Sequence, residues 1–226
     1  MAALNPRRQA VFIAGALLAA GLLLCGCTNP FAPAKPQPPN GGGVIEDFST
    51  PDRLLQTIED AIKDKGPSGA TAYADAMGDS TGPGTRAFYA FHDSRVVDAW
   101  RIGAQRDPPS PWDLRLERIF YNYLIGVFPT FEYTFQWASD PNSPLDDRQP
   151  ESAVLHRYYV LQASGADGAI QKIIAIGYAD LYLQKRDSRW FLYRWQDRLD
   201  ENIGVNPTDT DNRTMGWRRL DSQTRP

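Results

Sequence analysis

The sequence contains few of the residues from which metal centres and most enzyme active sites are built. It has only two cysteines, Cys25 and Cys27, and only two histidines, His92 and His156, in 226 residues. A zinc site would need more such ligands at closer spacing. The nucleophile-elbow, metalloprotease, Cys-x-x-Cys and phosphate-binding glycine motifs are also absent from the sequence. We therefore expect no metal and no cofactor, and any catalysis would depend on carboxylates and tyrosines.

Positive charge is scarce as well. The chain carries 24 Lys and Arg residues against 27 Asp and Glu residues, which gives a net charge of −3. No basic stripe is available to neutralise the phosphates of a nucleic acid. We therefore do not expect nucleic acid among the partners of this protein.

The start of the chain has the features of a secretion signal. Arg7 and Arg8 precede an uncharged apolar run, residues 10–24, which is shorter than the roughly 20 residues of a spanning helix. The run ends in Leu24-Cys25-Gly26-Cys27, which resembles the lipobox of bacterial lipoproteins. Cys25 fits that pattern poorly because the large Leu24 would occupy the small-residue position. We predict a signal peptide over residues 1–26, cleavage before Cys27, and attachment to the membrane through acyl chains such as palmitate on Cys27.

The residues after the cysteine predict its location and its attachment. Thr28 stands where inner-membrane lipoproteins of the enterobacterial pattern carry Asp, which favours the outer membrane of the bacterial cell envelope, with the domain facing the periplasm. Residues 29–43 contain five prolines followed by three glycines, so residues 27–43 are expected to form an extended, loose tether. No second cysteine would remain in the mature chain, so no internal disulfide is expected.

Residues 44–200 are expected to form a single folded domain. A helix should begin at Thr50 and Pro51, because a hydroxyl cap followed by proline is a typical helix start. Its apolar residues recur at helical spacing: Leu54, Leu55, Ile58, Ala61 and Ile62. The tail, residues 201–226, is expected to dock only where Met215, Trp217 and Leu220 can be buried.

Further helices are expected before the middle of the chain. We predict a short helix at 68–77, a break at 78–84, a strand at 86–92 and a helix capped by Asp93. The strongest amphipathic pattern follows Ser110-Pro111 and consists of Trp112, Leu116, Ile119, Phe120, Tyr123 and Leu124.

The remainder of the domain is predicted to be extended. Apolar and polar residues alternate over 131–137, and long extended runs cover 153–163, 171–185 and 189–197. Turns at 165–168 and 186–188 would join the three long runs as hairpins. These patterns predict an α+β fold in which N-terminal helices pack on one face of a curved antiparallel sheet. Four side chains are expected to lie in its core: Trp112, Phe120, Phe135 and Leu181.

This order of elements resembles the NTF2-like cone, the superfamily that includes ketosteroid isomerases, scytalone dehydratases and SnoaL-like cyclases. The sequence is similar to bacterial lipoproteins of that superfamily in its Thr-Pro-x-x-Leu-Leu helix start at 50–55, its Gly-x-Ala strand at 177–179, and its Trp-x-x-x-x-Trp-x-Asp strand at 190–197. The resemblance covers residues 49–198. It departs at Gly66-Pro67-Ser68-Gly69, where relatives tend to carry a charged turn. The resemblance implies a cavity between the helices and the sheet.

Five residues are candidates for lining that cavity or binding a ligand: Tyr178, Asp180, Tyr182, Tyr193 and Trp195. Asp180 lies in an apolar strand between two tyrosines, which suits either a pocket acid of raised pKa or a solvent-facing side chain.

Other polar residues have simpler interpretations. Asp197 would pair with an arginine or cap a helix, Glu117 and Glu132 would be solvated, and the two histidines would be surface or hydrogen-bonded side chains. Residues 209–212 resemble a calcium loop only faintly, because Arg213 and Thr214 stand where an oxygen ligand and a glycine belong.

Three functions are compatible with these features. The first is a non-catalytic envelope domain that binds a small apolar ligand or a protein partner. The alternative is a cofactor-independent isomerase, dehydratase or cyclase acting in the cone cavity, and the third is a structural domain docked on an envelope assembly. Carboxylate and tyrosine groups close together in the cavity would favour the enzyme, and an aromatic and aliphatic lining would favour binding.

Overall fold

A computed structural model describes residues 43–78, 86–139, 143–165, 171–200 and 214–224. The predicted signal peptide, Cys27 and the tether up to residue 42 lie outside the described residues. The same is true of residues 209–212 and of most of the loops at 78–84 and 165–168. No helix among the described residues is both long enough and apolar enough to cross a membrane.

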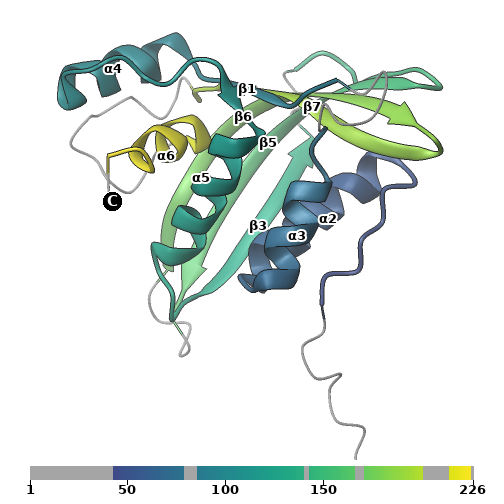
Figure 1. Cartoon of the computed structure of the whole chain (residues 1–226), viewed down its shortest axis with the longest axis horizontal. Helices are drawn as coiled ribbons and strands as arrows, with labels where there is room; N and C mark the ends of the chain where they lie inside the picture. Colours follow the sequence, from purple (N-terminus) through teal and green to yellow (C-terminus); the bar gives the residue numbers. More distant parts are fainter. Residues whose placement is uncertain (1–42, 79–85, 140–142, 166–170, 201–213, 225–226) are drawn as a thin grey trace, which may run out of the picture. The chain divides into compact units, whose positions relative to one another are not determined.

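The described residues form five helices and seven strands (Figure 1). The helices are α2 (Pro51–Asp64), α3 (Pro67–Asp75), α4 (Ser94–Ala104), α5 (Leu114–Gly126) and α6 (Met215–Asp221). The strands are β1 (Tyr89–Phe91), β2 (Trp112–Asp113), β3 (Glu132–Ser139), β4 (Asp147–Arg148), β5 (Ser152–Ser164), β6 (Gln171–Arg186) and β7 (Arg189–Arg198).

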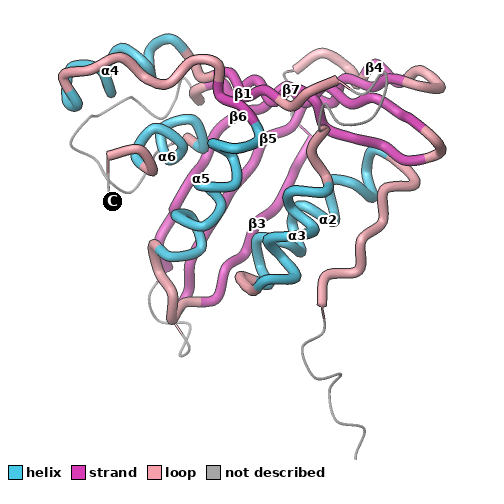
Figure 2. The backbone as a smooth tube through the Cα atoms, in the orientation of Figure 1, coloured by secondary structure: helices cyan, strands magenta, loops and turns pink. Residues whose placement is uncertain are grey.

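All seven strands belong to one sheet. Its order is β2-β1-β7-β6-β5-β3, with β4 paired to β5, and every pair is antiparallel except β1 with β7. Figure 2 shows the long strands β5 and β6 passing behind α5, with α2 and α3 beside β3. The α+β class and the packing of N-terminal helices on a curved, mainly antiparallel sheet, both expected from the sequence, are confirmed.

The first helix begins as its sequence predicts. The Thr50 hydroxyl accepts a hydrogen bond from the Arg53 backbone N–H, and Pro51 occupies the first helical position. Its apolar residues are buried, and α2 ends at Asp64, beyond which Lys65 adopts a positive φ of 55°.

The glycine-rich interruption after α2 has a packing role. A Cβ on Gly69 would lie 2.4 Å from the Ala61 carbonyl oxygen and 2.6 Å from the Tyr121 hydroxyl. Only glycine therefore allows α3 to approach α2 and α5 this closely.

The prediction for α5 was wrong about the residue at which the helix begins and about the burial of one of its apolar residues. The helix begins at Leu114 because the Asp113 side chain accepts from the Leu116 N–H, while Trp112 pairs with Ala90 in the sheet. The buried face contains Leu116, Phe120 and Leu124 as expected, but Ile119 is 42% exposed.

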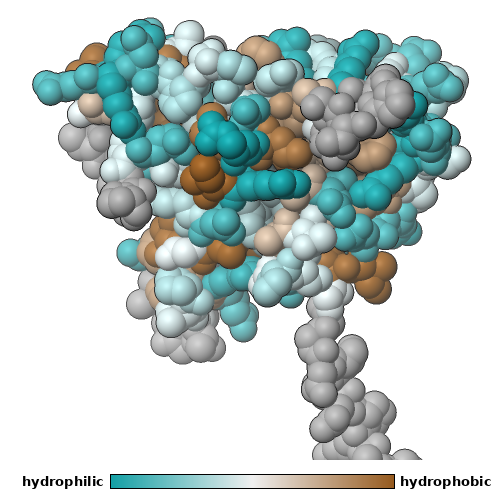
Figure 3. Space-filling model, in the orientation of Figure 1, coloured by the Kyte–Doolittle hydropathy of each residue, from teal (hydrophilic) through white to brown (hydrophobic). Residues whose placement is uncertain are grey.

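The sheet buries one of its two faces. Along β5 and β6 alternate residues are buried, and the intervening ones are only half-buried, as a period of two requires. Trp112, Phe120, Phe135 and Leu181 are all buried, which confirms that prediction. On the side seen in Figure 3, hydrophilic side chains cover most of the surface and apolar ones form smaller patches between them.

Candidate functional site

The central sequence candidates lie on the face of the sheet that is turned away from the helices, here called the outer face. Tyr178, Asp180 and Tyr182 are half-buried, whereas their neighbours Ala179 and Leu181 are fully buried in the core beneath the helices. Asp180 and these tyrosines therefore do not lie beneath the helices, and this placement agrees with the solvent-facing alternative for Asp180. That these residues bind a ligand stays a prediction. A period of two groups these residues on one face but does not reveal which face the helices cover.

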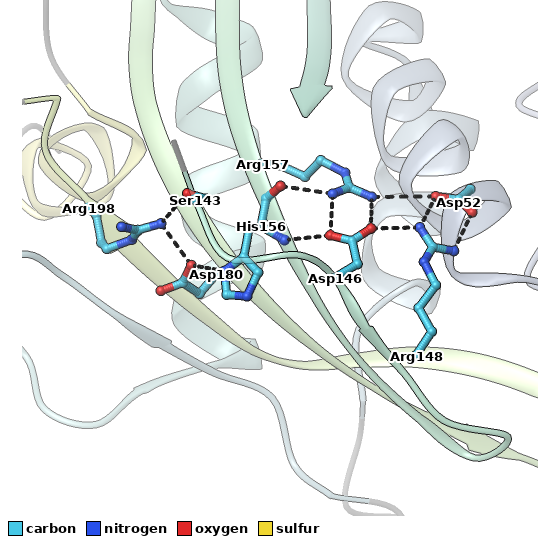
Figure 4. A network of polar contacts seen from close by, with 8 residues as sticks. All are labelled: Asp52, Ser143, Asp146, Arg148, His156, Arg157, Asp180 and Arg198. Carbon is cyan, nitrogen blue, oxygen red and sulfur yellow. Dashed lines mark hydrogen bonds and ion pairs between the residues drawn. The ribbon is translucent and has the colours of Figure 1, made fainter. Parts of the chain in front are cut away.

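Asp180 has two polar partners on the outer face (Figure 4). Its Oδ1 lies 2.7 Å from Nδ1 of His156 and accepts a hydrogen bond of 2.9 Å from Nη2 of Arg198. His156 is therefore hydrogen-bonded, which is one of the two placements expected from the sequence. The partner is opposite it in the next strand, because the register of β5 and β6 aligns His156 with Asp180.

The rest of the network in Figure 4 ties α2 to the β4–β5 hairpin. Arg157 forms a bidentate contact with Asp146 at 2.7 and 2.8 Å, and Arg148 forms another with Asp52 at 2.6 and 2.8 Å. Burial alone would raise the pKa of Asp146, but hydrogen bonds from Arg157 and Arg148 lower it below its usual value. The two arginines balance the two carboxylates, so this network serves the fold.

A second polar cluster lies in the interior and consists of Tyr73, Trp112, Glu117 and Arg219. Arg219 donates from Nε and Nη2 to the two oxygens of Glu117, both at 2.8 Å. The Tyr73 hydroxyl and the Trp112 indole N–H donate to the same carboxylate at 2.7 Å. Glu117 and Arg219 are both 0% exposed, so the expectation that Glu117 is solvated was wrong. Glu132, by contrast, is exposed as expected.

Asp197 anchors the start of α6. Its Oδ1 accepts from the Tyr159 hydroxyl at 2.6 Å, and its Oδ2 accepts from the Gly216 N–H at 2.7 Å. Burial raises the pKa of Asp197, although Arg219 and these hydrogen bonds act in the opposite direction. The interpretation of Asp197 as a helix-capping carboxylate is confirmed.

The last two sequence candidates separate. Trp195 shares the buried face with Asp197, and the Arg219 guanidinium lies 4.4 Å from its ring centroid. Tyr193 is half-buried and lies beside the ring of Tyr182, at a point where the register of β6 and β7 shifts. Because of that shift, Tyr193 is not buried on the same face as Trp195, although the two are only two residues apart.

Helix α6 packs between α4, α5 and the sheet. It contacts α4, α5 and β6, and its residues Met215, Arg219 and Leu220 are fully buried. The expected cavity of the cone is therefore filled at this position by the chain itself.

A groove of about 440 Å³ opens at the end of the sheet, between β1, α4 and the segment 107–112. We call it the His92 groove. Its floor and walls include Tyr89, Phe91, His92 and Trp112, and Pro108, Pro109 and Pro111 line it as well. Tyr89 and Phe91 are 38% and 48% exposed, which is high for aromatic side chains.

His92 is the unusual member of this groove. Both of its ring nitrogens are buried, and neither has a hydrogen-bond partner among the residues that the structure describes. Burial, with a smaller effect of Arg219, lowers the pKa of His92 to about 3, so the ring is neutral at pH 7. The expectation of a surface or hydrogen-bonded histidine was wrong here. Sequence offers no signal for this placement, because the residues around His92 come from β1, β2 and α6.

Among the residues that the structure describes, no group of three or more His, Cys, Asp or Glu side chains is arranged to hold a metal ion.

No protein-family model matches the sequence, and a search of curated proteins found no match. Solved structures that are similar to this chain include a protein of unknown function from Mycobacterium tuberculosis, with 13% identity and a TM-score of 0.47 over 76% of this chain and 83% of that one. A putative scytalone dehydratase from Novosphingobium aromaticivorans has 10% identity and a TM-score of 0.44, over 72% and 89% of the two chains. An NTF2-like superfamily protein from Salmonella enterica has 13% identity and a TM-score of 0.41, over 68% and 90%. These likenesses concern the fold alone.

Proposed function

We propose that this protein is a lipoprotein of the bacterial cell envelope, tethered through Cys27, whose periplasm-facing domain binds a small apolar ligand without catalysis. The order of positive segment, apolar run and lipobox supports the tether. The proline- and glycine-rich segment up to residue 43 would separate the domain from the membrane surface.

The observation that carries the binding proposal is the filling of the cone by α6. Catalysis in the cone would require a titratable group within hydrogen-bond reach of a substrate. The buried carboxylate of Glu117 is already paired with Arg219, and Asp197 holds the start of α6. The open groove beside β1 has a mainly aromatic and aliphatic lining, which is typical of small-molecule sites.

A protein partner is the second candidate, and the outer face favours it. Tyr158 and Tyr178 lie side by side there with ring centroids 5.0 Å apart, and Tyr182 and Tyr193 continue the row. Tyrosines and arginines are enriched at protein interfaces. Arg194 stacks on Tyr182 at 4.6 Å, so this part of the outer face already combines both residue types.

The attachment is tested by labelling cells with radioactive palmitate. We expect Cys27→Ser to abolish incorporation and to remove the protein from the membrane fraction, because Cys27 alone fits the lipobox. Cys25→Ser is the matched control and should incorporate label like the original chain. Loss of labelling in Cys25→Ser, or normal labelling in Cys27→Ser, would contradict the proposed attachment site.

A further inference from the structure

The His92 groove combines two features that a purely structural surface does not need. It leaves Tyr89 and Phe91, two large aromatic side chains, 38% and 48% exposed. It also contains a histidine with two buried, unpartnered ring nitrogens. Leaving a buried polar group without a hydrogen bond costs about 1–3 kcal/mol, so such groups are rare in folded proteins.

The size and charge of the groove limit what can occupy it. A volume of about 440 Å³ lies within the range of small-molecule sites. The charged residues at its edge, Arg101 and Asp107, neutralise each other through a hydrogen bond of 2.8 Å between Nε and Oδ1. Among the described residues that line the groove, no charge is therefore left unpaired, and an uncharged occupant fits it best.

The aromatic lining favours a planar occupant. Tyr89 and Phe91 contribute exposed ring surface, and flat molecules gain offset or edge-to-face contacts with such rings. Trp112 is itself held in place, because its indole N–H donates to Glu117 and its ring meets His92 in a T-shaped contact with centroids 5.3 Å apart. A flat ligand would therefore meet a rigid floor.

His92 can supply one specific polar contact. A neutral imidazole has one N–H donor and one acceptor nitrogen. Its Nδ1 lies near α6, since a Cβ on Gly216 would be 3.2 Å from that atom. No hydrogen bond holds the ring in this orientation. A half-turn of the ring about the Cβ–Cγ bond would therefore break no hydrogen bond to a described residue. It would bring a nitrogen to the edge of the ring that is turned away from α6.

We infer that the His92 groove binds a small, planar, uncharged aromatic molecule that carries one hydroxyl or similar hydrogen-bonding group. This inference rests on the proposed ligand-binding function and assigns it a site and a ligand class. The exposed rings of Tyr89 and Phe91 cover the faces of the ligand, and His92, once its ring has made the half-turn, pairs with the polar group of the ligand.

The test uses 2-naphthol as the probe, because it is planar, uncharged at pH 7 and has one hydroxyl. The full lipidated chain in detergent micelles is titrated, with protein-free micelles as the blank, and binding is followed by NMR shifts of the groove residues. We expect saturable binding that weakens at least about tenfold in His92→Leu, because one hydrogen bond to a buried group is lost. Phe91→Ala should also weaken it, whereas Ile119→Ala, which removes an exposed apolar side chain outside the groove, should not.

Stability measurements separate a binding role of His92 from a structural one. If His92 is there for a ligand, His92→Leu should be at least as stable as the original chain, because it removes two unpartnered buried nitrogens. His92→Gln keeps a donor and an acceptor. Its affinity for 2-naphthol should therefore lie between that of His92→Leu and that of the original chain. A less stable His92→Leu with unchanged affinity would overturn the inference.

The outcomes also separate this inference from the proposed function. Saturable binding that His92→Leu and Phe91→Ala leave unchanged, with shifts elsewhere in the domain, would overturn the groove assignment and leave the ligand-binding function in place. Absence of any saturable binding would overturn the assigned ligand class. Neither result alters the palmitate labelling of Cys27, which tests the attachment separately.

Discussion

The buried pair of Glu117 and Arg219 offers the sharpest test of the interior described above. Both side chains are 0% exposed, and two hydrogen bonds of 2.8 Å join them. Arg219→Met would remove the positive charge and leave a buried carboxylate with only the Tyr73 and Trp112 donors. Removing one partner of a buried ion pair typically costs about 3–5 kcal/mol, since the other charge stays in a medium of low polarity.

A second substitution shows whether the cost comes from the stranded charge. Glu117→Gln combined with Arg219→Met leaves no buried charge, and the Gln oxygen can still accept from Tyr73 or Trp112. We expect this double variant to be more stable than Arg219→Met alone by at least about 1 kcal/mol. Arg118→Met is the matched control, because Arg118 is an exposed neighbour of Glu117 on α5. This substitution should change the free energy of unfolding by less than about 0.5 kcal/mol.

The assay is urea unfolding followed by tryptophan fluorescence, with the midpoint and the slope compared between variants. An Arg219→Met variant within about 1 kcal/mol of the original chain would refute a buried pair. A double variant that is no more stable than Arg219→Met would refute the explanation by a stranded charge.

Two further predictions concern the core and the pH dependence of stability. Phe135→Ala should lower the free energy of unfolding by about 3–5 kcal/mol, because the side chain is 0% exposed. Phe91→Ala should lower it by less than about 1 kcal/mol, because that side chain is 48% exposed. Equal losses of the two variants in urea unfolding would contradict the assigned burial. Burial and Arg219 lower the pKa of His92 to about 3, so the unfolded chain, with a pKa near 6.5, binds the proton more readily. The contribution of His92 to stability is therefore complete above pH 6.5 and falls by up to about 1.4 kcal/mol per unit as the pH decreases toward 3. The advantage of His92→Leu should grow between pH 7 and pH 5, and a constant difference would contradict the buried, neutral ring.

Local sequence signals predicted the elements whose boundaries depend on neighbouring residues. The cap of α2 at Thr50 and its proline at position 51 were correct, because capping involves atoms only three residues apart. The cap of α4 at Asp93 was correct for the same reason. The start of α5 was misplaced because Ser110-Pro111 and Asp113 both resemble helix starts. The choice between them was made by pairing of Trp112 with Ala90, which is distant in the chain.

The candidate site was predicted less well, for a related reason. Asp180 was selected because it is a carboxylate in an apolar strand, but its partners His156 and Arg198 come from the two adjoining strands. Glu117 was dismissed because it lies beside the apolar stripe of its own helix. Its burial depends on Arg219, which is 102 residues away in the sequence.

The amino-acid sequence by itself determined the lipobox prediction at Cys27, the α+β class, and the alternation that places Phe135 and Leu181 in the core. These features follow from local spacing, and a period of 2 or 3.6 is visible in one stretch of chain. Only the tertiary structure decided which face of the sheet the helices cover, that α6 packs into the interior, and that both ring nitrogens of His92 are buried without a partner among the described residues. The physical reason is that each of these features depends on contacts between distant segments, and the free energy of burial is not set by the spacing within either segment.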